Sequence, residues 1–281
     1  MPEEPRLPSR IHRVSVAPTA LDGVELVEAT SDRAFPRHSH DQFGIGWMAA
    51  GAHRSWSGRG PVEAGPGDVI AVNPEELHDG LPVRGEPRSW CMAFVAPHAL
   101  ERLTGDGAGG RELVRPVASD PALARAVRSA YGLLREGSRV RAGEALALLF
   151  ADRLETADAE ARAPGAPSAP VRRILERLHD AAGEPASLDE LAALAGMSRT
   201  GALRRFRREV GATPGAYALQ LRVRRARALL AGGTGLADAA AAAGFADQSH
   251  LTRAFGRQFG LPPGRWRSAL RAGNPVQDAP T

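Results

Sequence analysis

The stretch AAAGFADQSHLTRAFGRQFGLPP, residues 241–263, carries the strongest structural signal in this chain of 281 residues. A second stretch, GMSRTGALRRFRREVGATPGAY at residues 196–217, repeats its pattern. Phe206 corresponds to Phe255, 49 residues later, and one inserted residue explains the offset of 48 at the leading glycines. Each copy has a glycine-containing turn, a helix and a Gly-x-x-Pro ending. The repeat therefore predicts two helix-turn-helix units.

Start and stop signals of helices surround both copies. Ser187 and Glu190 fit a capping box, in which the serine side chain accepts a hydrogen bond from the backbone of the glutamate. Ser198 can cap the next helix. Thr213 and Pro214 supply an N-cap and a first-turn proline for a longer helix that ends at the next pair of glycines. We therefore expect the last hundred residues to be helical.

Apolar residues recur at helical spacing within each copy. Phe206 and Val210 share one face of the first helix, and Leu251, Phe255 and Phe259 share one face of the second. We expect these faces to be buried. The opposite faces carry arginine, glutamine and histidine, and we expect them to be exposed.

Charge is divided unevenly along the chain. Residues 1–170 hold 19 Arg against 23 Asp and Glu, a net charge of −4, whereas residues 171–271 hold 17 Arg against 8 Asp and Glu, a net charge of +9. Asp278 brings the total to +4. A basic C-terminal third on an acidic body is expected when one domain binds a polyanion.

The first hundred residues have a strand-like pattern. Compact apolar runs at residues 43–48, 69–72 and 90–95 are separated by turn signals such as Gly65-Pro66-Gly67-Asp68. Many short strands at this spacing indicate an all-β barrel or sandwich. Helical periodicity follows at residues 121–135 and 141–157, and a proline-rich segment predicts a linker.

Residues 171–270 resemble the DNA-binding domain of AraC/XylS-type transcription regulators over their whole length, and residues 241–263 look like the signature of that family. The resemblance implies a seven-helix, two-lobed domain whose long central helix holds two recognition helices in successive major grooves. A helix of about 17 residues is about 25 Å long, so with its flanking turns it approaches the repeat of about 34 Å in B-DNA.

Residues 30–96 resemble the small β-barrel of cupins, which AraC-type regulators use to bind effectors. The resemblance rests on the pair His38 and His40, a Pro-Gly-Asp turn, and His78 after Pro74. The expected fold is α+β, with an N-terminal cupin-like β-barrel followed by two helices, then an all-α C-terminal domain with two helix-turn-helix units. The expected bounds are 11–160 for the effector-binding domain, 161–170 for the linker and 171–270 for the DNA-binding domain.

The DNA-contacting residues follow from the docking geometry of such helices. A recognition helix enters the major groove by its N-terminal half, so base contacts come from its first exposed turns. We expect base contacts from Arg199, Thr200, Leu203, Arg204, Gln248, Ser249, His250 and Arg253. We expect phosphate contacts from Arg205, Arg208, Arg257 and Arg267. The family usually has a polar residue at the position of Leu203, so this side chain either contacts a thymine methyl group or indicates a rotated helix.

Candidates for an effector site are His38, His40, Trp47 and His78. Metal-binding cupins add a glutamate a few residues after the H-x-H pair, and those positions are Gly44 and Ile45 here. Three imidazoles can still hold a divalent metal ion with water completing its shell. The alternative is that the histidines form hydrogen bonds in the barrel mouth or contact an organic effector. The sequence leaves both interpretations open.

The sequence favours a sequence-specific transcription regulator that binds double-stranded DNA and responds to a small-molecule effector. We expect no catalytic residues and a cytoplasmic location; contact with RNA polymerase is a further hypothesis. We also expect a homodimer, with the helices at 121–135 and 141–157 as candidates for its interface; the alternative is that these helices only pack on the barrel. The first alternative is a metal-dependent cupin enzyme fused to a DNA-binding module. The second is a nonspecific architectural DNA-binding protein.

Two classes are excluded by composition. No apolar stretch approaches the length of about 18–20 residues that spans a bilayer, so we expect no membrane partner. Cys91 is the only cysteine, which excludes an intrachain disulfide and a CxxC site.

Overall fold

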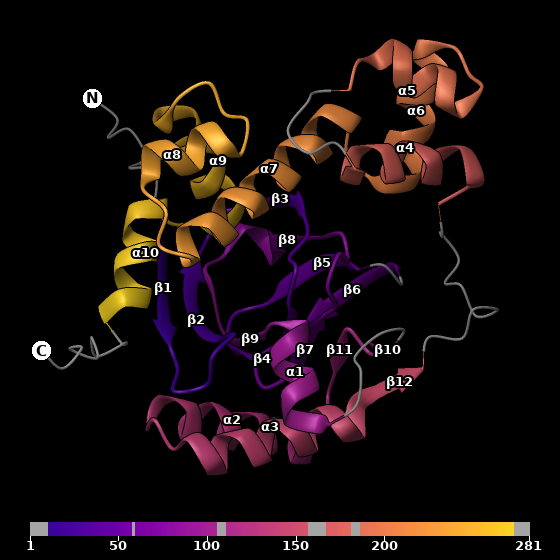
Figure 1. Ribbon diagram of the computed structural model, residues 1–281. Coiled ribbons are helices and arrows are strands. Elements are labelled where there is room, and N and C mark those ends of the chain that lie inside the picture. Colours follow the sequence, from indigo (N-terminus) through magenta and orange to yellow (C-terminus); the bar gives the residue numbers. More distant parts are fainter. Residues whose placement is uncertain (1–10, 58–59, 106–110, 157–166, 181–185, 273–281) are drawn as a thin grey trace, which may run out of the picture.

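The computed structural model describes residues 11–57, 60–105, 111–156, 167–180 and 186–272 (Figure 1). Strands make up residues 12–95, which we call the β region, and helices make up residues 169–272, which we call the helical region. Three helices and three short strands connect the two regions: α1 (Pro97–Thr104), β10 (Arg111–Leu113), β11 (Val117–Ala118), α2 (Pro121–Arg135), α3 (Arg139–Arg153) and β12 (Leu154–Thr156). The expected α+β class is confirmed.

The β region consists of two antiparallel sheets. The larger sheet has the strand order β1-β2-β9-β4-β7-β11 and the smaller has the order β3-β8-β5-β6. The strands are β1 (His12–Pro18), β2 (Val24–Ser31), β3 (Phe35–His38), β4 (Phe43–Ala50), β5 (His53–Ser57), β6 (Gly60–Ala64), β7 (Val69–Val72), β8 (His78–Pro82) and β9 (Arg88–Val95). Within the described residues the two sheets share no strand pairing. The strands therefore form two separate layers, and the hydrogen bonds do not close the expected barrel.

Alternation along the strands gives the larger sheet two different faces, because successive side chains point to opposite sides. Along β9, Ala93 and Val95 pack in the main hydrophobic core with α1, α2 and α3, whereas Met92 and Phe94 point to the other face and line a cavity. Helices α2 and α3 lie together along one side of the β region (Figure 1). The predicted apolar positions of α2 are buried: Leu123, Val127, Ala130 and Leu134.

Two expected boundaries are wrong. The helix expected at residues 141–157 ends at Arg153, and Leu154 begins strand β12, which pairs with β10. The linker expected at 161–170 falls partly outside the described residues, and its end is helical, because α4 (Ala169–Asp180) begins at Ala169.

Among its described residues, the helical region has the seven helices that the resemblance implied, arranged in two lobes. They are α4, α5 (Leu188–Ala195), α6 (Arg199–Val210), α7 (Pro214–Ala231), α8 (Leu236–Ala242), α9 (Gln248–Phe259) and α10 (Pro263–Ala272). Phe206 is fully buried in the core of the first lobe, and Phe255 is fully buried in the core of the second. The long helix α7 contributes to both cores, so it joins the two lobes (Figure 1).

The predicted caps of the helices are confirmed. The side chains of Ser187, Ser198 and Thr213 accept hydrogen bonds from the backbone three residues ahead, at 3.2, 3.1 and 3.2 Å. Gly211 ends α6 with a φ of 80°, a left-handed conformation that favours glycine. Only the serine half of the predicted capping box forms among the described residues, because the Glu190 carboxylate accepts from Arg177 at 2.5 Å.

The buried faces of the recognition helices differ from expectation at one position. Phe206, Val210, Leu251 and Phe255 are buried as predicted, but Phe259 is only half-buried in its lobe. Its ring lies at the edge of the lobe and faces the β region. Among the described helices, none is long and apolar enough to cross a lipid bilayer.

Replacing Phe206 by Ala is expected to lower the free energy of unfolding by about 3–5 kcal/mol, because it leaves a cavity in the core of the first lobe. The control is Leu194→Ala in the same lobe, where the side chain is 39 % exposed and the expected loss is below about 1 kcal/mol. Urea unfolding followed by helical circular dichroism measures both. Equal losses in the two variants would contradict the assignment of this core.

Candidate functional site

A cavity of about 150 Å³ lies where the β region meets the helical region. Strands of both sheets contribute apolar side chains to its wall, among them Trp90, Met92 and Phe94 of β9. The helical region also contributes to the wall, through Arg227, Gln258, Phe259, Leu261 and Trp266. A molecule in this cavity would therefore contact both regions at once.

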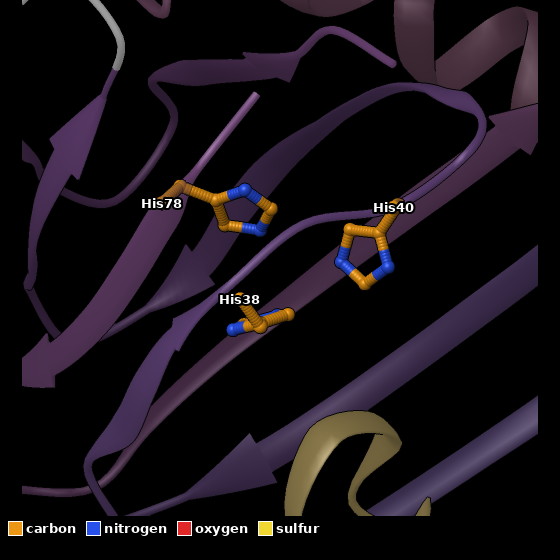
Figure 2. Close-up of side chains that lie close together, drawn as sticks. All are labelled: His38, His40 and His78. Carbon is orange, nitrogen blue, oxygen red and sulfur yellow. The ribbon is translucent and has the colours of Figure 1, made fainter. Parts of the chain in front are cut away.

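Three histidines stand together in the cavity wall (Figure 2). His38 is the last residue of β3 and pairs in register with His78, the first residue of β8. His40 lies in the loop that follows β3. The ring centroids are 4.5–5.0 Å apart, and one ligand nitrogen of each ring lies within 4.8 Å of the others. The structure thus brings together the three histidines that the sequence singled out.

Hydrogen bonds to the backbone orient two of these rings. His38 Nδ1 donates to the Pro36 carbonyl at 2.8 Å, and His78 Nδ1 donates to the Glu76 carbonyl at 3.0 Å. A carbonyl can only accept, so in a neutral ring the proton stays on Nδ1 and Nε2 keeps its lone pair.

The environment keeps the three imidazoles uncharged. Burial lowers the pKa of His38 to about 3 and the pKa of His78 to about 4. Burial also lowers the pKa of His40 well below its usual value, and the neighbouring imidazoles and the cations Arg227 and Arg224 add to this effect. At neutral pH the three rings are therefore neutral and can act as acceptors or as metal ligands.

Trp47, which the sequence placed among the effector-site candidates, does not line this cavity. Trp47 lies on the opposite face of β4 from the cavity, where its ring packs edge-on against Tyr131 of α2 at 5.1 Å. Among the tryptophans of the β region, Trp90 lines the cavity, whereas Trp56 is 39 % exposed and lies under the guanidinium of Arg37. The alternation of β9 is the sequence signal that would have selected Trp90.

Gly44, one of the positions where metal-binding cupins have a glutamate, has no room for a side chain. A Cβ atom there would lie 2.7 Å from Val72, 2.9 Å from Met92 and 2.9 Å from Phe94. A carboxylate at this position would therefore require the cavity wall to move.

Arg227 of α7 holds the helical region against the β region. Its guanidinium is buried and donates to Glu25 of β2, to Asp41 at 3.0 Å and to Gln42 at 2.5 Å. Its other surroundings are aromatic, because it lies 5.2 Å from the ring centre of Trp266 and also packs on the ring of Phe259. Arg227 thus belongs both to the cavity wall and to the contact between the regions.

Further contacts join the same two regions. Arg224 forms an ion pair with Glu75 at 2.5 Å, one helical turn before Arg227. Gln220 donates to the Arg37 carbonyl at 2.7 Å, and Gln258 donates to the Ser39 carbonyl at 3.2 Å.

Apolar contacts follow the same boundary. Val14 and Val16 of β1 pack against the core of the second lobe, and Leu77 packs against the core of the first. Neither lobe is therefore independent of the β region.

The residues expected to contact bases lie at the N-terminal ends of α6 and α9. Most are exposed: Arg199, Thr200, Arg204, Gln248, Ser249 and Arg253. Leu203 and His250 are half-buried, and the His250 ring lies edge-on to Phe245 at 5.1 Å. The buried neighbour of Leu203 is Ala202, so α6 turns its smaller side chain inward.

Several of the expected DNA-contacting arginines already have partners. Arg199 pairs with Asp189, Arg205 pairs with Glu209 at 2.8 Å, and Arg267 donates to the Thr234 carbonyl at 3.2 Å. Arg208 lies 3.6 Å from Glu209. Among the described residues, Arg204, Arg253 and Arg257 form no ion pair, so a DNA contact by these side chains would not break one.

Two family models match the chain. The model described as an AraC-like ligand binding domain matches residues 23–151, and the model described as a helix-turn-helix domain matches residues 191–269. The first match covers most of the β region together with α1, α2 and α3, and the second covers α6 to α9 completely.

Two relatives align over most of the chain. The HTH-type transcriptional regulator YbfI of Bacillus subtilis is 29 % identical over 225 residues, which is 77 % of this chain and 81 % of that protein. The HTH-type transcriptional activator RhaR of Klebsiella pneumoniae is 27 % identical over 284 residues, 91 % of this chain and 95 % of that protein. The crystal structure of a substituted apo ToxT from Vibrio cholerae has the same fold, with a TM-score of 0.51 and 12 % identity over 92 % of this chain and 97 % of that one.

Replacing Arg227 by Met is expected to lower the free energy of unfolding by about 3–5 kcal/mol, because Glu25 would remain buried without its cation. The matched control is Arg225→Met on the same helix, where the side chain is exposed and the loss should stay within about 0.5 kcal/mol. Urea unfolding of the full chain gives both values. If the two variants unfold at the same urea concentration, Arg227 does not hold the regions together.

Proposed function

The chain belongs to the AraC family of DNA-binding transcription regulators, and on this premise we propose that the cavity between its two regions is the effector site through which DNA binding is controlled. One observation carries the proposal: side chains of the DNA-binding part complete the wall of the cavity. An effector changes DNA binding only if its affinity differs between two states of the protein. A ligand that touches both regions meets this condition whenever the regions move apart.

The chemistry of the cavity indicates the kind of effector. Its wall is mostly apolar, and its polar groups include the three imidazoles, Arg227 and the carboxylates of Glu25, Glu76 and Asp79. Such a wall suits a small ligand with an apolar body and a few polar atoms. We therefore keep His38, His40 and His78 as effector contacts and add Arg227 and Trp90.

The DNA contacts in this proposal come from the exposed ends of α6 and α9. The base contacts that the geometry supports best are Arg204, Gln248 and Arg253. Their side chains are exposed and belong to the N-terminal halves of α6 and α9, the part of a recognition helix that enters the major groove. Arg257 is the best-supported phosphate contact. Arg199 and Arg205 contribute if DNA competes successfully with Asp189 and Glu209 for their guanidinium groups.

Catalysis is not part of this proposal. The relatives are transcription regulators, and the cavity offers no room for a carboxylate at Gly44. Glu76 also lines the cavity, but its carboxylate accepts from the backbone and side chain of Asn73 at 3.0 and 2.9 Å. We assign Glu76 to holding this loop.

We propose a homodimer in which α3 supplies the interface. Val140 and Leu148 of α3 are 73 % and 72 % exposed, the largest exposed fractions among the large apolar side chains of the described residues. Burying such side chains against a second copy would remove apolar area from water. A contact with RNA polymerase remains a prediction, and we place the regulator in the cytoplasm with the DNA that it binds.

Arg253→Ala is expected to weaken binding to the specific site by about 1–3 kcal/mol and to leave binding to unrelated DNA nearly unchanged, if Arg253 contacts a base. The matched variant is Arg257→Ala, one turn further along α9, which should weaken binding to all sequences alike. Selection from a random DNA library first identifies the site, and binding is then measured at one fixed salt concentration. Equal losses on every sequence would reassign Arg253 to a phosphate.

Leu148→Glu is expected to dissociate the dimer, because it places two carboxylates in an apolar interface. Leu81→Glu, an exposed position on β8, serves as the control and should leave the dimer intact. Sedimentation equilibrium over a range of protein concentrations measures the association. An unaltered chain that is monomeric and binds its site one-to-one would defeat the dimer proposal.

A further inference from the structure

The histidine cluster and the contacts between the regions share two loops. We call them the cluster loops: residues 38–42, which end β3 and lead into β4, and residues 73–78, which connect β7 to β8. Each loop carries at least one imidazole of the cluster, and each also contacts the helical region. The two sets of contacts are therefore only a few bonds apart along the backbone.

Residues of the first cluster loop alternate between the histidine cluster and contacts with the helical region. His38 and His40 belong to the cluster, whereas the Ser39 carbonyl accepts from Gln258 of α9. Asp41 and Gln42 accept from the buried guanidinium of Arg227. A movement of the His40 ring is therefore passed to groups that hold α7 and α9.

The second cluster loop has the same construction. His78 belongs to the cluster, and Leu77 packs in the core of the first lobe. Glu75 forms the ion pair with Arg224, and it does so with a φ of 63°, a left-handed conformation that a non-glycine residue rarely adopts. This loop therefore places the Glu75 carboxylate against α7 and the His78 ring in the cluster. Both contacts hold its backbone conformation.

The cluster itself has the donor set of a transition-metal site. Three neutral imidazoles bring their ligand nitrogens within 4.8 Å of one another. Two of the rings are oriented by Nδ1–H hydrogen bonds to carbonyl groups, which is the usual support of metal-binding histidines and leaves Nε2 as the ligand. Imidazole nitrogens suit zinc, copper, nickel and iron ions, whereas magnesium and calcium prefer oxygen ligands.

We propose that His38, His40 and His78 bind one divalent first-row transition-metal ion, and that this ion controls DNA binding by drawing the two cluster loops together. The metal site stands on the geometry alone, whereas its regulatory effect rests on the proposed function. The ion is then either the effector itself or a part of the effector site that binds the effector molecule.

The size of the movement follows from the coordination distances. Nitrogen ligands lie about 2.0–2.1 Å from zinc, so the corners of a tetrahedral site are about 3.4 Å apart. Nitrogens separated by up to 4.8 Å have to approach by as much as about 1.4 Å to bind one ion. A displacement of this size in both loops changes the positions of the groups that hold Arg224 and Arg227.

The positive charge of a bound metal ion also acts on the contact between the two regions. None of the three ligand residues is a carboxylate, so a bound divalent ion adds positive charge to a wall that also contains Glu25, Glu76 and Asp79. Arg227 and Arg224 are close enough to interact electrostatically with His40. The added charge therefore repels the cations that dock the helical region, and we expect metal binding to loosen this docking.

The first experiment measures metal binding without DNA. The full chain, purified without a histidine tag and freed of metal with a chelator, is titrated with Co²⁺ and then with Zn²⁺, and the visible absorption of cobalt reports coordination. We expect one ion per chain and a loss of affinity of at least about 10-fold in His40→Gln. His78→Asn is the second ligand variant, and His98→Gln, at an exposed position on α1, is the control that should bind like the unaltered chain.

The second experiment compares binding to the selected DNA site with Zn²⁺ and with chelator. We expect a change in affinity of at least about five-fold in the unaltered chain and in His98→Gln, and below two-fold in His40→Gln.

A chain that binds its DNA site but takes up no metal overturns this inference and leaves the proposed function intact. Metal uptake without any DNA preference overturns the proposed function and leaves the metal site. Metal uptake with unchanged DNA affinity overturns the coupling.

Discussion

The buried guanidinium of Arg227 is the interaction on which the arrangement of the two regions depends. A cation removed from water needs opposite charge and hydrogen-bond acceptors, since leaving it unpaired costs several kcal/mol. Arg227 belongs to α7, whereas Glu25, Asp41 and Gln42 belong to the β region. The charge can therefore be satisfied in the interior only while the two regions are docked.

This docking connects the cavity to DNA through a single helix. Gln258 and Phe259 at the C-terminal end of α9 line the cavity, and Gln248 and Arg253 are exposed towards its other end. A helix of 12 residues is about 18 Å long and moves as a rigid element. A ligand that displaces the cavity end of α9 therefore also displaces the end that we propose enters the major groove.

Local signals in the sequence predicted the local structure well. The caps at Ser187, Ser198 and Thr213 and the repeated glycines located the helices, because they act within a few residues. Trp47, a candidate for the effector site, does not line the cavity, since a shift of one position along a strand moves a side chain to the opposite face. The partners of Arg224 and Arg227 could not be predicted, because they lie far away in the sequence. The sequence of a basic helix face also does not reveal whether that face contacts water, DNA or another domain. The family resemblance supplied the architecture but not this contact.

The distance between the two regions in solution tests the central claim most directly. The chain first carries Cys91→Ser, which removes its own cysteine. Spin labels are then attached at two exposed positions, Glu63→Cys on β6 and Ala242→Cys on α8. Pulsed electron paramagnetic resonance measures their separation in the absence of ligand. If the two regions are docked through Arg227, the distances form one narrow distribution that broadens when Arg227→Met is added. A broad distribution in the presence of Arg227 would mean that the regions are not docked, and the cavity would then have no helical wall through which to act.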